Sequence, residues 1–148
     1  MLLVGAGGVG QAIAVALALA GVGSLAIMNR TQAKADDLVQ KVRCVAPACA
    51  VETKAVYDPA GFDVVINATS LGHGDGQGPL PIEVSRVPET AIVAEVVLVP
   101  EYTPLLHAAQ ARGLDIVRGI EMFTPQFEIV ADFLGMTASA SAASGGKA

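Results

Sequence analysis

Three glycines near the start of the chain have the spacing of a phosphate-binding loop. Gly5, Gly7 and Gly10 follow a short apolar run, residues 1–4, and precede a second apolar stretch. In such a loop the first glycine makes a tight turn, the second lets the backbone approach a pyrophosphate, and the third lets a helix pack closely against a strand. The N–H groups at the start of that helix then favour a phosphate. Because strand, loop and helix occur in the required order, the pattern predicts a dinucleotide site.

The residues after the next apolar run indicate which dinucleotide is bound. This run, residues 25–28, ends in Asn29-Arg30-Thr31, and Lys34 lies one turn later. An acidic side chain here would bond a ribose 2′-hydroxyl, whereas Arg30 offers a planar fork of donors to a 2′-phosphate. Thr31 adds a hydroxyl and Lys34 adds positive charge, so we expect NADP rather than NAD. The alternative is that Arg30 and Lys34 are solvated charges beside a helix that Thr31 caps.

Length, charge and cysteine content narrow the class of protein. The 148 residues fit a single domain, and 53% of them are apolar, which suffices for a buried core. The net charge of −5 argues against a nucleic-acid partner. Cys44 and Cys49 have no nearby pair of histidines, so they fit neither a disulfide framework nor a zinc site. We therefore expect no metal, and reduced thiols in a cytoplasmic protein.

The uncharged start of the chain also raises the question of a membrane segment or a secretion signal. Residues 1–28 carry no charged side chain, and a bilayer-spanning helix needs only ~20 apolar residues. However, glycines interrupt the run, no Lys or Arg precedes it, and the uninterrupted helix expected at residues 11–20 is too short to span. We therefore expect no membrane partner.

Strand-like and helix-like segments alternate along the whole chain. Short apolar runs predict strands at residues 1–4, 25–28, 50–53, 63–67, 91–97 and 115–117, and helices are expected at 9–20, 31–42, 103–112 and 119–134. This alternation predicts a Rossmann-type doubly wound parallel sheet with strand order 3-2-1-4-5-6. The helix at 9–20 is apolar on nearly all faces, so we expect it to be buried on more than one side. The tail at residues 136–148 is rich in Ala, Ser and Gly and is predicted to be disordered.

Five motifs in this chain together resemble a known family. They are GAGGVG at residues 5–10, NRTQAK at 29–34, INATSLG at 66–72, EVVLVPEYTPLL at 95–106 and GIEMFTPQ at 119–126. In this order they resemble the C-terminal NADP domain of shikimate dehydrogenases, which reduce 3-dehydroshikimate to shikimate in the chorismate route to aromatic amino acids. The resemblance implies one NADP-binding Rossmann domain over residues 1–135. A glutamyl-tRNA reductase would share the domain type, but the last two motifs argue against it.

The resemblance implies roles for individual residues. Those that would line NADP are Gly5, Ala6, Gly7, Gly8, Val9, Asn29, Arg30, Thr31, Lys34, Asn67, Ala68, Thr69, Val96, Gly119 and Met122. Within this set, residues 5–9 would hold the pyrophosphate and residues 29–34 the adenosine ribose phosphate. Val96, Gly119 and Met122 would lie near the nicotinamide. Leu98 and Gln126 would face the substrate.

Two positions depart from the family's usual pattern. The family usually has Asp and, three residues later, Tyr where this chain has Glu95 and Leu98. The family's Tyr hydroxyl contacts the substrate, so Leu98 removes one hydrogen bond, and a site lacking such a bond can lose discrimination for a hydroxylated ligand. The resemblance therefore implies a divergent, shikimate-dehydrogenase-like member that acts on a shikimate-like hydroxy acid.

The resemblance also implies that the proton-transfer machinery lies elsewhere. In the family an N-terminal domain supplies a serine-rich substrate segment and a Lys–Asp pair that handles the proton, and no such segment occurs in this sequence. A positioned acid or base contributes ~10²–10⁴-fold to a rate. We therefore expect no catalytic residue in this chain, NADP binding, and little or no turnover by the chain alone. The alternative is a non-catalytic dinucleotide-binding or regulatory module.

Three further side chains could do chemistry on residue type alone. His73 lies in a glycine-rich loop, His107 follows Pro104 on an expected helix, and Tyr102 precedes that helix. Lone histidines are more often surface or packing residues than acids. Tyr102 fits either an aromatic near the substrate face or an ordinary turn residue.

Overall fold

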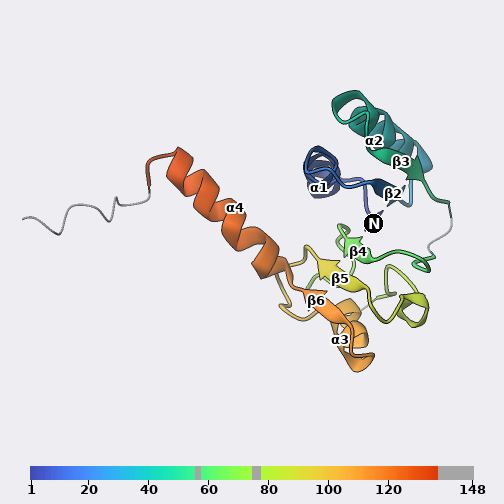
Figure 1. Cartoon of the computed structure of the whole chain (residues 1–148). Helices are drawn as coiled ribbons and strands as arrows, with labels where there is room; N and C mark the ends of the chain where they lie inside the picture. Colours follow the sequence, from blue (N-terminus) through green and yellow to red (C-terminus); the bar gives the residue numbers. More distant parts are fainter. Residues whose placement is uncertain (56–57, 75–77, 137–148) are drawn as a thin grey trace, which may run out of the picture.

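The computed structural model describes residues 1–55, 58–74 and 78–136 as alternating strands and helices (Figure 1). In chain order the elements are β1 (Leu2–Val4), α1 (Gly8–Leu19), β2 (Ser24–Met28), α2 (Gln32–Val45), β3 (Ala50–Thr53), β4 (Val64–Asn67), the short 3-10 helix η1 (Val84–Arg86), β5 (Ile92–Glu95), α3 (Pro104–Ala111), β6 (Asp115–Val117) and α4 (Gly119–Phe133). Each strand and helix expected from the sequence is present, with ends shifted by a few residues. The tail predicted to be disordered lies, beyond Met136, outside the described residues.

The strands form one parallel sheet with the predicted order β3-β2-β1-β4-β5-β6. Val4 at the end of β1 pairs with Met28 on one side and Asn67 on the other, and Asn67 pairs with Glu95. The carboxyl ends of the central strands therefore meet at one edge. In open α/β sheets this edge, where the strand order reverses, is where ligands bind.

Alternate strand residues point to two separate apolar layers, as the pleat of a strand requires. Leu3, Ile27 and Ile66 face the layer that contains α1 and α2. On the other face of the sheet, β1, β4 and β5 pack against α3 and η1 through a second set of buried side chains. The central strands are buried on both faces and consist almost wholly of aliphatic residues.

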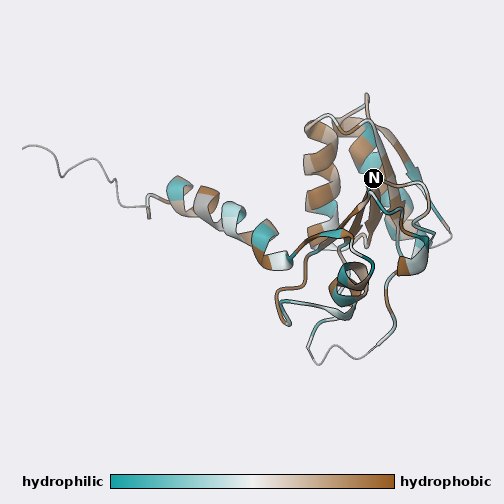
Figure 2. Ribbon diagram, turned by 60° about the horizontal axis from the view of Figure 1, so that its bottom comes forward, coloured by the Kyte–Doolittle hydropathy of each residue, from teal (hydrophilic) through white to brown (hydrophobic). Residues whose placement is uncertain are grey.

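As predicted, α1 is covered on more than one side, because it packs against both the sheet and α2, but it keeps one exposed side. Gly10, Ala14 and Ala18 lie against the sheet, whereas Val9 is 55% exposed and Leu19 is 65% exposed. The ribbon of α1 is hydrophobic along most of its length (Figure 2). The apolar residue types of α1 therefore do not indicate which of its sides are buried in the fold.

The last helix, α4, extends away from the sheet (Figure 1). Its far half exposes large apolar side chains, including Ile129 at 71% and Phe133 at 87%. In the residues described, no helix combines the length and the apolar character that crossing a bilayer demands.

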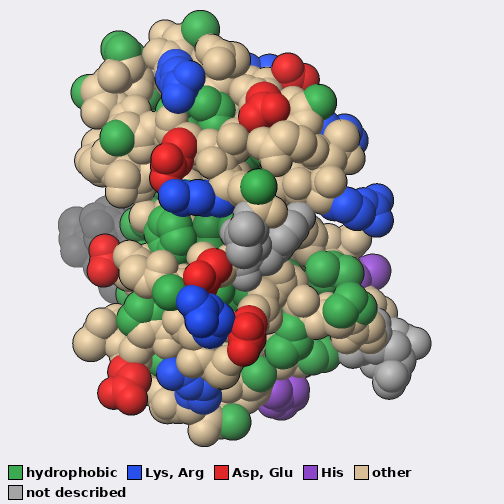
Figure 3. Space-filling view, turned by 90° about the vertical axis from the view of Figure 1, so that its right-hand side faces the viewer, with side chains coloured by type: hydrophobic (Ala, Val, Ile, Leu, Met, Phe, Trp, Pro, Cys, Tyr) green, Lys and Arg blue, Asp and Glu red, His purple; other side chains and the backbone are tan. Residues whose placement is uncertain are grey.

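One face of the molecule carries charges of both signs. On the face shown in Figure 3, Lys and Arg side chains are interspersed with Asp and Glu rather than gathered in one area.

Cys44 is exposed and Cys49 is buried, and both are free thiols. Within the described ranges no group of His, Cys, Asp and Glu is arranged to hold a metal ion.

Candidate functional site

The glycine loop joins β1 to α1 with the backbone geometry expected of the motif. Gly5 has φ +112°, and a Cβ there would lie 2.6 Å from the carbonyl oxygen of Ala68. A Cβ on Gly10 would lie 2.2 Å from the carbonyl oxygen of Gly5, so only glycine lets α1 approach this close. Gly7 is the opposite case, because a Cβ there would meet no protein atom within 4 Å. The loop is thus tight toward the protein at Gly5 and Gly10 and open toward solvent at Gly7.

Asn29 braces this loop against the end of β2. Its Oδ1 accepts a hydrogen bond from the Ala6 N–H at 3.1 Å, and its Nδ2 donates to the carbonyl oxygen of Thr31 at 2.9 Å. The side chain of Gln11 donates to the Ala6 carbonyl at 3.4 Å and accepts from Lys41 at 2.9 Å. These contacts fix the loop relative to the residues on either side of Arg30. Ala6 itself is buried, so we expect it to act through its backbone.

A first cavity, of about 920 Å³, borders the carboxyl ends of β1, β2 and β4. Of the residues expected to bind the cofactor, it is lined by Gly5, Gly7, Asn29, Arg30, Thr31, Lys34, Ala68 and Thr69. Val4, Ser70, Leu71 and residues 79–83 complete its wall. The cavity therefore combines a backbone cradle, cationic side chains and an apolar surface.

The cationic end of this cavity consists of Arg30, Thr31 and Lys34, all of them exposed. Thr31 occupies the N-cap position of α2, but its side chain makes no capping hydrogen bond. The alternative interpretation is therefore correct that Thr31 is the N-cap residue of α2, although the hydroxyl does not bond the N–H groups of the helix. In the part of the chain that the structure describes, neither Arg30 nor Lys34 forms an ion pair. Both cations and the hydroxyl are thus available to an anion at the start of α2, where the helix N-terminus also favours negative charge.

A second cavity, of about 850 Å³, lies between α1 and α4. It is lined by the remaining candidates other than Ala6 and Asn67, namely Gly8, Val9, Val96, Leu98, Gly119, Met122 and Gln126. Most of its other lining is aliphatic or aromatic, so it suits an apolar ring better than a phosphate. The first cavity reaches the glycine loop at Gly7, and the second reaches it at the next residue, Gly8. One elongated ligand that crosses the start of α1 can therefore occupy both.

Asn67 lies beneath this site rather than in it. Its side chain is 1% exposed, and its Nδ2 donates to both carboxylate oxygens of Glu95 at 3.0 Å. Its Oδ1 accepts from the N–H and the hydroxyl of Thr69, at 3.1 and 2.7 Å. We therefore expect Asn67, predicted to face the cofactor, to act by orienting Thr69, which lines the first cavity.

Glu95 is a buried carboxylate at the end of β5. It accepts hydrogen bonds from the backbone N–H groups of Val96 and Val97 at 2.9 and 3.1 Å and from the hydroxyl of Thr103 at 3.0 Å. Burial raises the pKa of Glu95, and the hydrogen bonds from Asn67, Val97 and the other donors oppose that rise. The Thr103 hydroxyl also accepts from the Leu106 N–H, so it caps α3.

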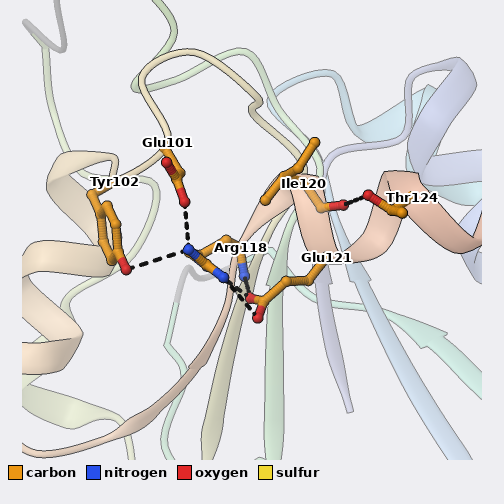
Figure 4. A network of polar contacts seen from close by, with 6 residues as sticks. All are labelled: Glu101, Tyr102, Arg118, Ile120, Glu121 and Thr124. Atoms are coloured by element: carbon orange, nitrogen blue, oxygen red, sulfur yellow. Dashed lines mark hydrogen bonds and ion pairs between the residues drawn. The ribbon is translucent and has the colours of Figure 1, made fainter.

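An exposed ion-pair network ties the start of α4 to the segment after β5 (Figure 4). Arg118 pairs with Glu101 and, at 3.1 Å, with Glu121, and its guanidinium lies 5.6 Å from the ring centroid of Tyr102. The hydrogen bonds from Arg118 lower the pKa of Glu121 to about 2. Tyr102 stacks in turn on His107, with ring centroids 5.8 Å apart. Tyr102 is therefore a packing residue of this network.

The two histidines are not brought to either cavity. His73 is exposed in the loop after β4, and His107 is exposed on α3 against Tyr102.

Sequence reasoning missed the roles of Gln11, Glu95 and Arg118. Arg118 and Glu121 have the three-residue spacing of a helical ion pair, which could have indicated their pairing. The partners of Gln11 and Glu95 come from distant parts of the chain, and no local pattern identifies them.

Comparison with known proteins identifies similar sequences. The sequence profile of the family described as shikimate / quinate 5-dehydrogenase matches residues 1–73. A shikimate dehydrogenase (NADP(+)) from Sphingopyxis alaskensis is 42% identical over 124 residues, which cover 84% of this chain and 43% of that protein. The chain thus spans less than half the length of this relative.

Solved structures resemble the fold over nearly the whole chain. The ligand-free 5-ketofructose reductase of Gluconobacter sp. strain CHM43 is 35% identical with a TM-score of 0.83, covering 93% of this chain and 51% of that one. Shikimate 5-dehydrogenase from Thermus thermophilus, in complex with NADP(H) and shikimate, is 27% identical with a TM-score of 0.78, covering 93% and 50%. From the motifs, the fold and these matches we conclude that the chain belongs to the shikimate dehydrogenase family.

Proposed function

We propose that this chain is the NADP-binding half of a shikimate-type dehydrogenase, an NADP-dependent oxidoreductase. The single observation that supports this most strongly is the first cavity, where exposed cationic side chains adjoin an open glycine loop. The residues fit the coenzyme because Gly7 leaves room for a pyrophosphate and Arg30 offers a fork of donors to a 2′-phosphate. Relatives named for NADP, such as that of Sphingopyxis alaskensis, support the same coenzyme.

The proposed coenzyme site runs across both cavities. Gly5 to Val9 contact the pyrophosphate, and Asn29 to Lys34 surround the adenosine ribose with its phosphate. Ala68 and Thr69 face the middle of the coenzyme from the end of β4. Val96, Gly119 and Met122 form the apolar wall against which the nicotinamide lies. This order follows the path from the first cavity over the start of α1 into the second.

The proposed reaction is reversible hydride transfer between the coenzyme and a carbon that bears a hydroxyl or ketone group. When bound, NADPH supplies the hydride. The residues of this chain bind and orient it, and the apolar lining of the second cavity limits water at the reacting face. Gln126 lines the same cavity and can donate or accept a hydrogen bond with the substrate. Leu98 offers only an apolar contact there.

The substrate proposed for the whole protein is 3-dehydroshikimate or a related hydroxy acid, on the chorismate route in the cytoplasm. We propose that a second domain, like that in the unmatched part of the relatives, shares this substrate and supplies the acid that protonates its oxygen. The apolar side chains that the far half of α4 exposes support this division, because large exposed apolar areas favour contact with further protein.

The test is an assay of the longest polypeptide that carries this chain. NADP⁺ reduction is measured by the absorbance of NADPH, with shikimate, with quinate and with no added substrate. Shikimate-dependent reduction is the expected result. A protein that binds NADPH but oxidises neither compound would instead be a non-catalytic dinucleotide-binding module, and the proposed activity would be rejected.

A further inference from the structure

A buried carboxylate lies between the two cavities, and the proposed reaction does not use it. The side chain of Glu95 is 0% exposed, so it can touch neither coenzyme nor substrate. Among the described residues, each of its hydrogen-bond partners is a donor, provided by Asn67, Val96, Val97 and Thr103. Burying a carboxylate is costly unless donors compensate it. If Glu95 contributes to this site, it must therefore act through the residues that it bonds and not by contact with coenzyme or substrate.

The bonds of Glu95 reach the walls of both cavities. Asn67 links Glu95 to the first cavity. Its Nδ2 donates to Glu95, and its Oδ1 accepts from the hydroxyl of Thr69, a residue that lines that cavity. Toward the second cavity, the carboxylate holds the backbone N–H groups of Val96 and Val97. One side chain thus connects the ends of β4 and β5.

The Val96–Val97 peptide in turn sets the position of α4. A Cβ on Gly119 would lie 2.2 Å from the Val97 carbonyl oxygen and 3.0 Å from the carbonyl carbon of Val96. The first turn of α4 therefore rests directly on the backbone of Val96 and Val97, with the closest approach at the Val97 carbonyl. A shift of the peptide would move Gly119 and, with it, Met122, and both residues line the second cavity.

We propose that Glu95 is a positioning residue that holds the nicotinamide end of the coenzyme site in register with its adenosine end. The proposal rests on the proposed function, because it assigns the second cavity to the nicotinamide. Glu95 acts through the Val96–Val97 peptide and through Asn67, and not by contact with the coenzyme. Thr103 completes the arrangement by fixing the second carboxylate oxygen to the start of α3.

Substitution with glutamine tests this role with almost no change in shape. Carboxylate oxygens accept at both ends, whereas an amide would direct an NH₂ group toward donors that already point inward. Either Asn67 or the Val96–Val97 N–H groups would lose a partner, and an unpaired buried donor is unfavourable. We therefore expect Glu95→Gln to fold and to displace the wall of the second cavity.

The experiment compares two probes on the chain. NADPH extends over both proposed cavities, whereas adenosine 2′,5′-bisphosphate carries the 2′-phosphate but no nicotinamide. Glu95→Gln should raise the Kd for NADPH about tenfold and change the Kd for the bisphosphate less than about twofold, as loss of one or two hydrogen bonds predicts. Enhancement of nicotinamide fluorescence on binding should fall as well. Glu89→Gln, which removes an exposed carboxylate, is the matched control and should change neither Kd.

A second pair of variants covers the case in which Glu95→Gln does not fold. Thr103→Val removes the donor to Glu95, and Thr103→Ser keeps it. The valine variant should bind NADPH about threefold more weakly than the serine variant, with equal affinity for the bisphosphate. Equal effects on both probes, or none on NADPH, would overturn the positioning role. Failure of the unsubstituted chain to bind NADPH would instead overturn the proposed function.

Discussion

Arg30 is held in place through the backbone on either side of it. Asn29 bonds the Ala6 N–H on one side and the Thr31 carbonyl on the other, so the backbone on both sides of Arg30 is tied to the glycine loop. The guanidinium itself remains exposed at the cavity. A cation whose backbone is fixed and whose head group faces an open cavity is well suited to select a phosphorylated ribose.

Replacing Arg30 should therefore change coenzyme preference more than coenzyme binding in general. We expect Arg30→Ala to reduce the preference for NADPH over NADH by ~1–3 kcal/mol, the range for a hydrogen bond between charged groups. The measurement is the Kd for each coenzyme from nicotinamide fluorescence. Lys54→Ala, which removes an exposed cation paired with Glu52 outside both cavities, should leave the preference unchanged. Equal losses for both coenzymes would show that Arg30 does not contact the distinguishing phosphate.

The candidate coenzyme-binding residues that lie close together in the sequence could be predicted. The residues that contact each other across neighbouring strands could not. The glycines and Arg30 are recognisable because loop and strand tip are contiguous in sequence, and their function follows from spacing. Glu95 contacts Asn67, 28 residues earlier, only because β4 and β5 pair in a register that places the two side by side. Sequence reasoning noticed Glu95 as a departure from a family pattern but gave no physical role for it.

At the scale of elements, the contact between β1 and α1 makes the sharpest prediction about stability. A Cβ on Gly10 would lie 2.2 Å from the Gly5 carbonyl oxygen, and backbone cannot yield as a flexible side chain can. Gly10→Ala should therefore lower the free energy of unfolding by about 2–3 kcal/mol or more, as overpacking does.

Gly8→Ala is the matched control, because a Cβ there meets nothing within 4 Å. Alanine favours a helix over glycine by up to about 1 kcal/mol, so this variant should be as stable as the original or more so. Urea unfolding without coenzyme measures both variants. A Gly10→Ala variant as stable as Gly8→Ala would contradict the close contact described for α1.

The start of α4 makes a prediction about acid stability. Hydrogen bonds from Arg118 lower the pKa of Glu121 from 4.5 to about 2 in the folded chain. Because the folded pKa is the lower one, this pair stabilises the fold above pH 4.5, and its contribution is lost as the pH falls toward 2. Between pH 4.5 and pH 2, the free energy of unfolding should therefore fall less for Glu121→Gln than for the original chain. Urea unfolding at a series of pH values measures this. Identical pH profiles would show that the pair does not persist in solution.

The order and type of the elements could be predicted from the sequence, but not which faces are covered. Alternating apolar runs indicate buried parallel strands because both faces of such strands need apolar side chains. The exposed positions of α1, Val9 and Leu19, are the same residue types as buried ones. Burial there depends on what packs against α1, which is information that a helical sequence does not contain.

At the scale of the whole molecule, the chain spans about half the length of its relatives, and its proposed coenzyme site is nearly complete within it. A ligand that binds only the folded state stabilises it by RT ln(1 + [L]/Kd), ~2.7 kcal/mol at a hundredfold excess over Kd. NADPH should therefore raise the melting temperature of this chain, whereas shikimate alone should raise it little because part of its proposed site lies in another domain. A thermal-shift assay checks both. A larger shift with shikimate than with NADPH would contradict the proposed division.

The central claim is that cationic side chains at the end of β2 select the phosphorylated coenzyme, and one titration tests it most directly. The isolated chain is titrated with NADPH and with NADH at one ionic strength, and nicotinamide fluorescence gives both Kd values. NADPH should bind at least about tenfold more tightly, which corresponds to ~1.4 kcal/mol from its additional phosphate. Equal affinity for the two coenzymes, or tighter binding of NADH, would contradict the role assigned to Arg30 and Lys34.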